Sequence, residues 1–208
     1  MSSRILPRLY LLTDRHQTLH RPLPSVITEA VDAGVRMVQV REKDLRTREL
    51  TSLCQQLCPL IKHHQGTILV NDRIDLVLAL GADGVHLRTD SLPVSVARRL
   101  LGTRYLIGVS THSVEEARVA EAEGADFIVL GPIFDTPSKR AYGPPLGIQV
   151  LQEAGRFLHL PIYAIGGITP IRIPDVLSAG AYGVAVISSI LQSPSIPGTT
   201  RELLARLS

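Results

Sequence analysis

Short apolar runs alternate along the chain with longer stretches in which polar and apolar residues mix at helical spacing. Eight runs rich in Val, Ile and Leu can be recognised: Leu9–Thr13, Met37–Arg41, Ile68–Asn71, Gly84–Leu87, Tyr105–Ser110, Phe127–Gly131, Pro161–Ile165 and Gly183–Ser188. Continuous apolar runs are typical of strands buried on both faces of a parallel sheet, and the stretches between them predict helices. The pattern therefore predicts eight strands, each followed by a helical crossover.

Four related segments, each containing a glycine, stand just before predicted strands: Ala33-Gly34-Val35-Arg36, Leu80-Gly81-Ala82-Asp83, Glu123-Gly124-Ala125-Asp126 and Ala179-Gly180-Ala181-Tyr182. Glycine tolerates the left-handed conformation that ends a helix and lets the chain turn into the next strand. Open doubly wound sheets use the same turns, but the count of eight favours a closed barrel. We predict one α/β domain, a (β/α)₈ TIM barrel over residues 1–208, with residues 135–147 as a long loop of the kind that forms lids.

The composition limits the kinds of ligand and partner that we expect the protein to bind. The chain has a net charge of +3 with scattered Lys and Arg, no Trp, three Phe and five Tyr, which favours small anions and argues against nucleic acid. No apolar run is long enough to span a membrane, and the apolar N-terminal segment is too short for a signal peptide. Cys54 and Cys58 stand four apart in a predicted helix, a poor arrangement for a disulfide. We expect a cytoplasmic protein, and the sequence leaves homo-oligomerisation open.

Polar residues gather where the predicted strands end, and in such barrels the catalytic groups lie at that end. They are Asp14, Gln39, Arg41, Glu42, Lys43, Asn71, Asp72, Ser110, Thr111 and His112. Any one of the Asp, Asn, Ser or Thr residues could simply cap a helix. Their accumulation at one end of the barrel favours a functional site.

Glycines and hydroxyls follow the last two strands, at Gly166-Gly167 and Ile187-Ser188-Ser189. Glycine lets backbone N–H groups approach phosphate oxygens, and the positive end of a following helix faces the same anion. Two ordinary tight turns are the alternative. The barrel pattern favours a phosphate site between these turns.

Cations and a carboxylate follow strands two and three. Arg41, Lys43 and, from the long loop, Lys139 could neutralise a diphosphate leaving group, although Lys139 could equally be a solvated surface residue. Asp72 beside Asn71 could hold Mg²⁺. His112, just past strand five among hydroxyls, is the candidate general acid or base, whereas His86 lies in the apolar run of strand four and is interpreted as a core residue.

Seven segments together form a recognisable set. They are Gln39-Val40-Arg41-Glu42-Lys43, Asn71-Asp72-Arg73, Asp83-Gly84-Val85-His86-Leu87, Gly108-Val109-Ser110-Thr111-His112, Gly131-Pro132-Ile133-Phe134, Ile165-Gly166-Gly167-Ile168 and Val186-Ile187-Ser188. In order and spacing the chain resembles the thiamine phosphate synthase and thiazole tautomerase superfamily over nearly its whole length. The resemblance implies a (β/α)₈ barrel of vitamin B1 biosynthesis that acts on a thiazole phosphate.

The synthase branch of the resemblance implies a role for each site residue. The diphosphate of the aminopyrimidine substrate would be held by Arg41, Lys43, Asn71 and Lys139, Mg²⁺ by Asp72, and the departing group would meet Ser110. Gln39 is a further candidate for substrate binding. Thr136 and Ser138 match the family's Thr-x-Thr-Lys loop, with Ser in place of the second Thr. Gly166, Gly167, Ile187 and Ser188 would bind the thiazole phosphate.

One segment departs from the synthase pattern. The synthases usually carry Gly-Gln-x-Asp after Val-His-Leu, whereas here Arg88-Thr89-Asp90-Ser91 follows, so the second metal carboxylate is replaced by Ser91 and Asp90 lies one residue early. The tautomerase branch needs no metal and no diphosphate, and His112 matches its catalytic histidine. We therefore favour a tautomerase without a cofactor. The alternative is a Mg²⁺-dependent synthase, and a third hypothesis is a non-catalytic barrel that binds thiazole or thiamine phosphates.

Overall fold

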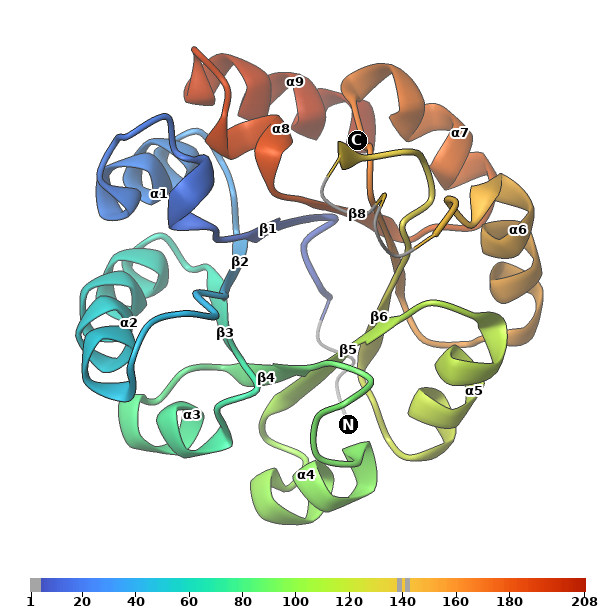
Figure 1. Ribbon diagram of the computed structural model, residues 1–208, viewed down its shortest axis with the longest axis horizontal. Coiled ribbons are helices and arrows are strands. Elements are labelled where there is room, and N and C mark those ends of the chain that lie inside the picture. Colours follow the sequence, from blue (N-terminus) through green and yellow to red (C-terminus); the bar gives the residue numbers. More distant parts are fainter. Residues whose placement is uncertain (1–4, 138–139, 141–142) are drawn as a thin grey trace.

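Eight parallel strands close into a barrel in sequence order, with β8 pairing back onto β1 (Figure 1). The computed structural model describes residues 5–137, 140 and 143–208. The strands are β1 (Leu9–Leu12), β2 (Met37–Val40), β3 (Thr67–Asn71), β4 (Gly84–Leu87), β5 (Leu106–Thr111), β6 (Phe127–Leu130), β7 (Ile162–Ile165) and β8 (Gly183–Val186). The (β/α)₈ barrel predicted from the apolar runs is confirmed.

Helices surround the barrel and cover the outer faces of its strands. The α-helices are α1 (Leu23–Asp32), α2 (Thr47–His63), α3 (Ile74–Leu80), α4 (Val94–Leu101), α5 (Val114–Ala122), α6 (Gly147–Phe157), α7 (Ile173–Ser178), α8 (Ser188–Leu191) and α9 (Ile196–Leu207). Two short 3₁₀ helices, η1 (Arg15–Gln17) and η3 (Pro170–Arg172), lie in βα connections. None of the described helices is long and apolar enough to cross a membrane.

Polar side chains cap the first turn of several of these helices, because they accept hydrogen bonds from N–H groups that have no partner within the helix. Ser113 accepts from the N–H of Glu116 at the start of α5, and Asp14 accepts from the N–H of His16 at η1. Cys54 and Cys58 are buried free thiols within α2, in agreement with the sequence. Asp14 therefore caps a helix, which was the alternative to a role in the functional site.

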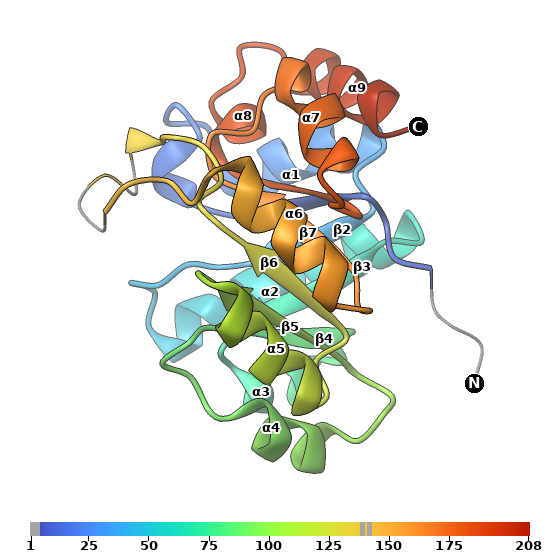
Figure 2. The same ribbon diagram turned by 90° about the vertical axis from the view of Figure 1, so that its right-hand side faces the viewer.

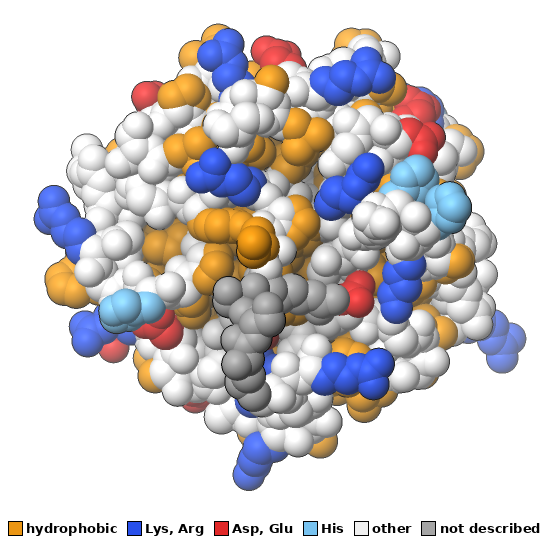
Figure 3. Space-filling model, turned by 180° about the vertical axis from the view of Figure 1, so that it is seen from behind, with side chains coloured by type: hydrophobic (Ala, Val, Ile, Leu, Met, Phe, Trp, Pro, Cys, Tyr) orange, Lys and Arg blue, Asp and Glu red, His pale blue; other side chains and the backbone are white. Residues whose placement is uncertain are grey.

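Two separate cores stabilise the barrel. Aliphatic residues fill the layer between strands and helices, whereas the barrel interior is built around Tyr10, Phe127 and Tyr163, whose rings pack edge to face with centroids 5.4–5.8 Å apart. The amino end of the barrel is tied to the N-terminal segment, because the Tyr163 hydroxyl donates to the Pro7 carbonyl and the Tyr182 hydroxyl to that of Leu6. Figure 3 shows hydrophobic side chains gathered near the centre of this end.

The other end carries the βα connections. In Figure 2 the connection between β6 and α6 lies on the opposite side of the barrel from the N-terminus. The eighth strand is shorter than predicted, because it ends at Val186 and Ser188 already begins the short helix α8. Ile187 therefore precedes α8 and Ser188 is its first residue, at the end of the barrel where the first N–H groups of a helix have no partner within the helix.

Candidate active site

A chain of buried hydrogen bonds crosses the barrel interior beneath the carboxyl ends of the strands. Gln39 Nε2 donates to the Tyr10 hydroxyl at 2.9 Å, this hydroxyl lies 3.3 Å from His86 Nδ1, and His86 Nε2 lies 2.9 Å from Ser110 Oγ. Tyr10, Gln39 and His86 are almost completely buried, so no water competes for these bonds. The chain joins two predicted site residues, Gln39 and Ser110, through one interpreted as core, His86.

The direction of the hydrogen bonds in this chain follows from Gln39. Because the Tyr10 oxygen accepts a hydrogen bond from Gln39, its own proton is donated to His86 Nδ1. Nδ1 is then an acceptor, and His86 Nε2 carries the ring hydrogen. Burial, reinforced by the nearby charge of Arg41, lowers the pKa of His86 to about 3, so the ring is neutral. His86 thus donates to Ser110, whose own proton remains available to a ligand. The sequence missed this positioning role because an apolar run hides it.

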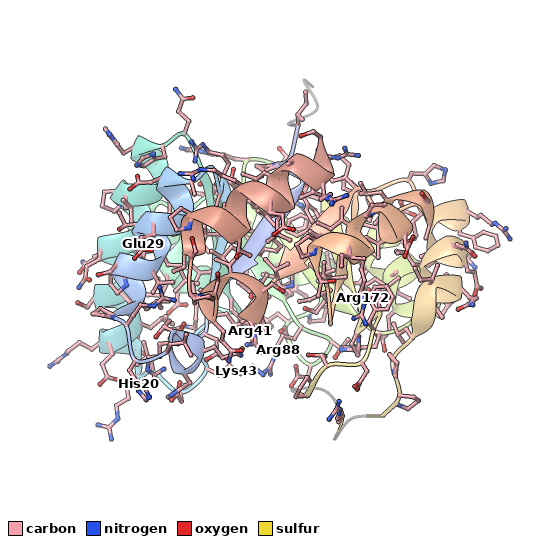
Figure 4. The ribbon with its side chains drawn as sticks, turned by 90° about the horizontal axis from the view of Figure 1, so that it is seen from above. His20, Glu29, Arg41, Lys43, Arg88 and Arg172 are labelled. Carbon is pink, nitrogen blue, oxygen red and sulfur yellow. The ribbon has the colours of Figure 1, made fainter. Side chains whose placement is uncertain are left out.

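Cations gather at the carboxyl end of the barrel. Figure 4 places Arg41, Lys43 and Arg88 in the same region of this end. Desolvation lowers the pKa of Arg41, the carboxylate of Asp14 opposes this shift, and the charge of Arg88 adds to it. The guanidinium of Arg41 has no hydrogen-bond acceptor recorded in the described part of the chain, so it can bind an anion.

Asp72 lies beside these cations and is already fully engaged. Its Oδ2 accepts from Asn71 Nδ2 at 2.9 Å and lies 3.2 Å from Arg88 Nε, while its Oδ1 accepts from the Ser91 hydroxyl. Asn71 Oδ1 is buried without a hydrogen-bond partner. Asp90, the residue that could have replaced the missing metal carboxylate, instead binds Arg88 Nη2 at 2.7 Å.

A second group of donors faces the same end from β7 and β8. Gly166 and Gly167 have φ angles of 95° and 63°, a region that favours glycine. Within the described residues, the N–H groups of Gly166, Gly167 and Ile187 have no recorded acceptor. Arg172 completes this side, because its Nη1 donates to the Gly167 carbonyl at 2.6 Å and its guanidinium lies 4.4 Å from the centre of the Phe134 ring. The arrangement suits a phosphate.

The comparisons with known proteins agree with this geometry. A family model described as "Thiamine monophosphate synthase" matches residues 9–190. The chain belongs to the thiamine monophosphate synthase family. A protein of Geobacter sulfurreducens named "Putative thiamine-phosphate synthase" is 49% identical over 96% of this chain and 93% of its own length. "Thiamine-phosphate synthase" of Roseiflexus sp. is 40% identical over 95% and 84%.

A solved structure supports the same assignment. Thiamine phosphate pyrophosphorylase from Pyrococcus furiosus superposes with a TM-score of 0.87 at 32% identity, over 96% of this chain and 95% of that one. The resemblance to the thiamine monophosphate synthase family that the motifs indicated is confirmed.

The Mg²⁺ that the family resemblance implies does not fit the side chains as they stand. Among the described residues no three His, Cys, Asp or Glu side chains are grouped so that they could hold a metal. Asp72 is the one carboxylate at the predicted position, and both its oxygens are held by Arg88, Ser91 and Asn71. A guanidinium occupies one side of the carboxylate on which a metal would have to bind.

Four other predicted residues have roles that the structure does not test. His112 is partly exposed, and its Nδ1 lies 3.5 Å from Glu116 in the first turn of α5. Thr136 is in the connection before α6, while Ser138 and Lys139 lie outside the described residues. The roles predicted for these four residues in the thiamine monophosphate synthase family therefore stay predictions.

Proposed function

We propose that this chain is a thiamine-phosphate synthase, which joins an aminopyrimidine diphosphate to a thiazole phosphate and releases diphosphate. The observation that carries the proposal is the presence of two separate anion-binding groups at one barrel end. One consists of the free N–H groups around Gly166, Gly167 and Ile187, and the other of the guanidinium groups of Arg41 and Arg88. A tautomerase acting on a thiazole carboxylate phosphate has no diphosphate to bind, so a pair of guanidinium groups opposite the phosphate-binding turns favours the synthase.

The relatives' names also support the synthase over the tautomerase. From the sequence alone we favoured the tautomerase and kept the synthase as the alternative. The tautomerase hypothesis depended on the lost carboxylate at Ser91 and on His112. The loss of a carboxylate weakens a metal site without removing the cations that a diphosphate needs. His112, for its part, has a surface carboxylate as its neighbour in the structure.

The proposed reaction forms one bond and breaks one. The thiazole nitrogen attacks the methylene carbon of the pyrimidine, the bond from that carbon to the diphosphate oxygen breaks, and the bonding pair leaves with the diphosphate. Negative charge therefore grows on the leaving oxygen, where fixed positive charges and O–H donors stabilise the transition state. Arg41 supplies charge, and Ser110, oriented by His86, supplies the donor. Lys43 is placed at the same end to assist.

A paired assay tests this proposal. The purified protein receives thiazole phosphate with aminopyrimidine diphosphate, in one buffer with Mg²⁺ and in one with a chelator, and separately the thiazole carboxylate phosphate tautomer. We expect thiamine phosphate in the first assay and a loss of about 100-fold in kcat/KM for Arg41→Gln, since a charge-assisted contact to the transition state is removed. A matched control is Arg201→Gln on the exposed face of α9.

The alternative outcomes are distinct. Proton exchange on the tautomer without any thiamine phosphate would replace the synthase with the tautomerase, and loss of that exchange in His112→Ala would identify its base. Binding of thiazole phosphate with neither activity would favour the non-catalytic barrel. Thiamine phosphate formed by wild type and by Arg41→Gln at equal rates would remove Arg41 from the mechanism.

A further inference from the structure

The turn after β4 brings a guanidinium group to the carboxylate that follows β3. Arg88 is the first residue of this turn, and its backbone N–H donates to Ser91 Oγ at 2.8 Å. The Ser91 hydroxyl in turn donates to Asp72 Oδ1, so the turn is fastened to the carboxylate. The register Asn71↔His86 between β3 and β4 sets these two segments next to each other.

Two carboxylates lie against the Arg88 guanidinium. Asp90 Oδ2 accepts a hydrogen bond from its Nη2 at 2.7 Å. Asp72 Oδ2 forms an ion pair at 3.2 Å from its Nε, which is buried and makes no hydrogen bond within the described residues. Within the described residues Nη1 has no recorded acceptor, and the side chain is 37% exposed. An arginine restrained in this way has already lost much of its rotamer freedom, and it still presents N–H donors to a ligand.

In a Mg²⁺ site of this kind, the carboxylate holds a cation that neutralises phosphate oxygens. Here Asp72 already holds a cation that is covalently part of the chain. Arg41 and Arg88 lie in the same region of the carboxyl end of the barrel (Figure 4), and the charge of Arg88 contributes to lowering the pKa of Arg41. Two guanidinium groups in one region can neutralise a diphosphate by charge-assisted hydrogen bonds without a metal.

Resting on the proposed synthase function, we propose that Arg88, held by Asp72 and Ser91, replaces the metal ion, so that this chain binds the diphosphate group without Mg²⁺. Compared with the synthase pattern that the resemblance implies, Arg88 then stands in place of the glycine and Ser91 in place of the second carboxylate. Arg88 becomes a binding residue for the leaving group, and Asp72 and Asp90 are positioning residues that act through it.

Binding of inorganic diphosphate, measured by calorimetry at matched ionic strength, tests the inference independently of turnover. For the wild-type chain we expect affinities with Mg²⁺ and with EDTA that agree within about threefold. Arg88→Gln should weaken binding in EDTA at least tenfold, as removal of a charge-assisted contact does. Arg201→Gln, which removes the same charge from an exposed position of α9, should leave it unchanged.

A second variant reverses the exchange. The double variant Arg88→Gly with Ser91→Asp should bind Mg²⁺ when titrated with the metal alone, and its affinity for diphosphate should rise at least tenfold on adding Mg²⁺. The wild type should show no heat of Mg²⁺ binding in the same titration.

Each outcome decides the inference. A wild type that binds diphosphate only with Mg²⁺, or an Arg88→Gln variant as tight as wild type in EDTA, overturns it and leaves the synthase proposal intact. Metal-free diphosphate binding through Arg88 without thiamine phosphate formation supports the inference as a statement about binding and overturns the synthase proposal. Absence of diphosphate binding in both buffers overturns both.

Discussion

Replacing His86 should change how the stability of this protein responds to acid. His86 is 1% exposed inside the barrel, and burial lowers its pKa from the ordinary 6.5 to about 3. The unfolded chain takes up a proton at this histidine below about pH 6.5, and the folded chain does not until about pH 3. The folded state is therefore penalised as the pH falls through 6.5, and the stability contribution is fully present above that pH.

The size of the effect follows from these two pKa values. Each pKa unit corresponds to about 1.4 kcal/mol, so acidification from pH 7 to pH 5 should cost about 2 kcal/mol of unfolding free energy through His86 alone. His86→Gln keeps a side chain of similar length that can accept and donate hydrogen bonds, but the glutamine amide does not titrate. The variant should be less stable at pH 7, yet its loss of stability between pH 7 and pH 5 should be about 2 kcal/mol smaller than that of wild type.

Urea denaturation at pH 7, 6 and 5 measures this difference, with His159→Gln as the control because His159 is 94% exposed. The control should follow the wild-type pH dependence. Nitrogen chemical shifts of the imidazole give a second measurement, which should report a neutral His86 down to pH 5. Equal pH dependence for wild type and His86→Gln, or a charged ring at pH 5, would refute the description of His86 as a neutral donor to Ser110.

Three further substitutions test other parts of the fold and site. Arg98→Met removes donors to the carbonyls of Gly102, Tyr105 and Gly124 and to Asp126, and it should cost about 2 kcal/mol in urea denaturation without changing diphosphate affinity. Gly167→Ala places a Cβ 2.7 Å from the Asp135 carbonyl and should raise KM for thiazole phosphate about tenfold, whereas Gly102→Ala, at nearly the same φ but with nothing within 4 Å, should not. Gly108→Ala brings a Cβ to 2.2 Å from Phe127 Cζ and should lower the unfolding free energy by about 1–3 kcal/mol, so an unchanged denaturation midpoint would contradict the close packing.

The strand order could be predicted from the sequence, because buried parallel strands leave continuous apolar runs. The polar residues at the carboxyl ends of these runs predict a candidate site there, and its role stays a prediction. The end of β8 could not be predicted from the sequence. Val186, Ile187 and Ser188 continue the apolar pattern, and only three-dimensional structure shows that the chain leaves the sheet after Val186 to begin α8.

Some features of the candidate site residues could likewise be predicted from the sequence, and others could not. Arg41 and Asp72 could be placed from their positions after strands, since a strand end fixes where a side chain starts. The partner that a side chain meets depends on the neighbouring turn, so the pairing of Asp72 with Arg88 was outside what the sequence predicts. His86 was interpreted as a core residue. It is buried, but the hydrogen bonds to Tyr10 and Ser110 connect it to the site, and contacts across a barrel leave no local pattern.

The fixed orientation of the hydrogen bonds from Gln39 to Ser110 has a consequence for ligand selection. A serine hydroxyl ordinarily rotates to suit either a donor or an acceptor, so it discriminates poorly between them. Here the Ser110 oxygen already receives the His86 hydrogen, so one of its two lone pairs is occupied and its own proton remains for a ligand. Ligands that offer only oxygen lone pairs to this position are favoured over ammonium or amide groups of the same size, and this preference is fixed before any substrate arrives.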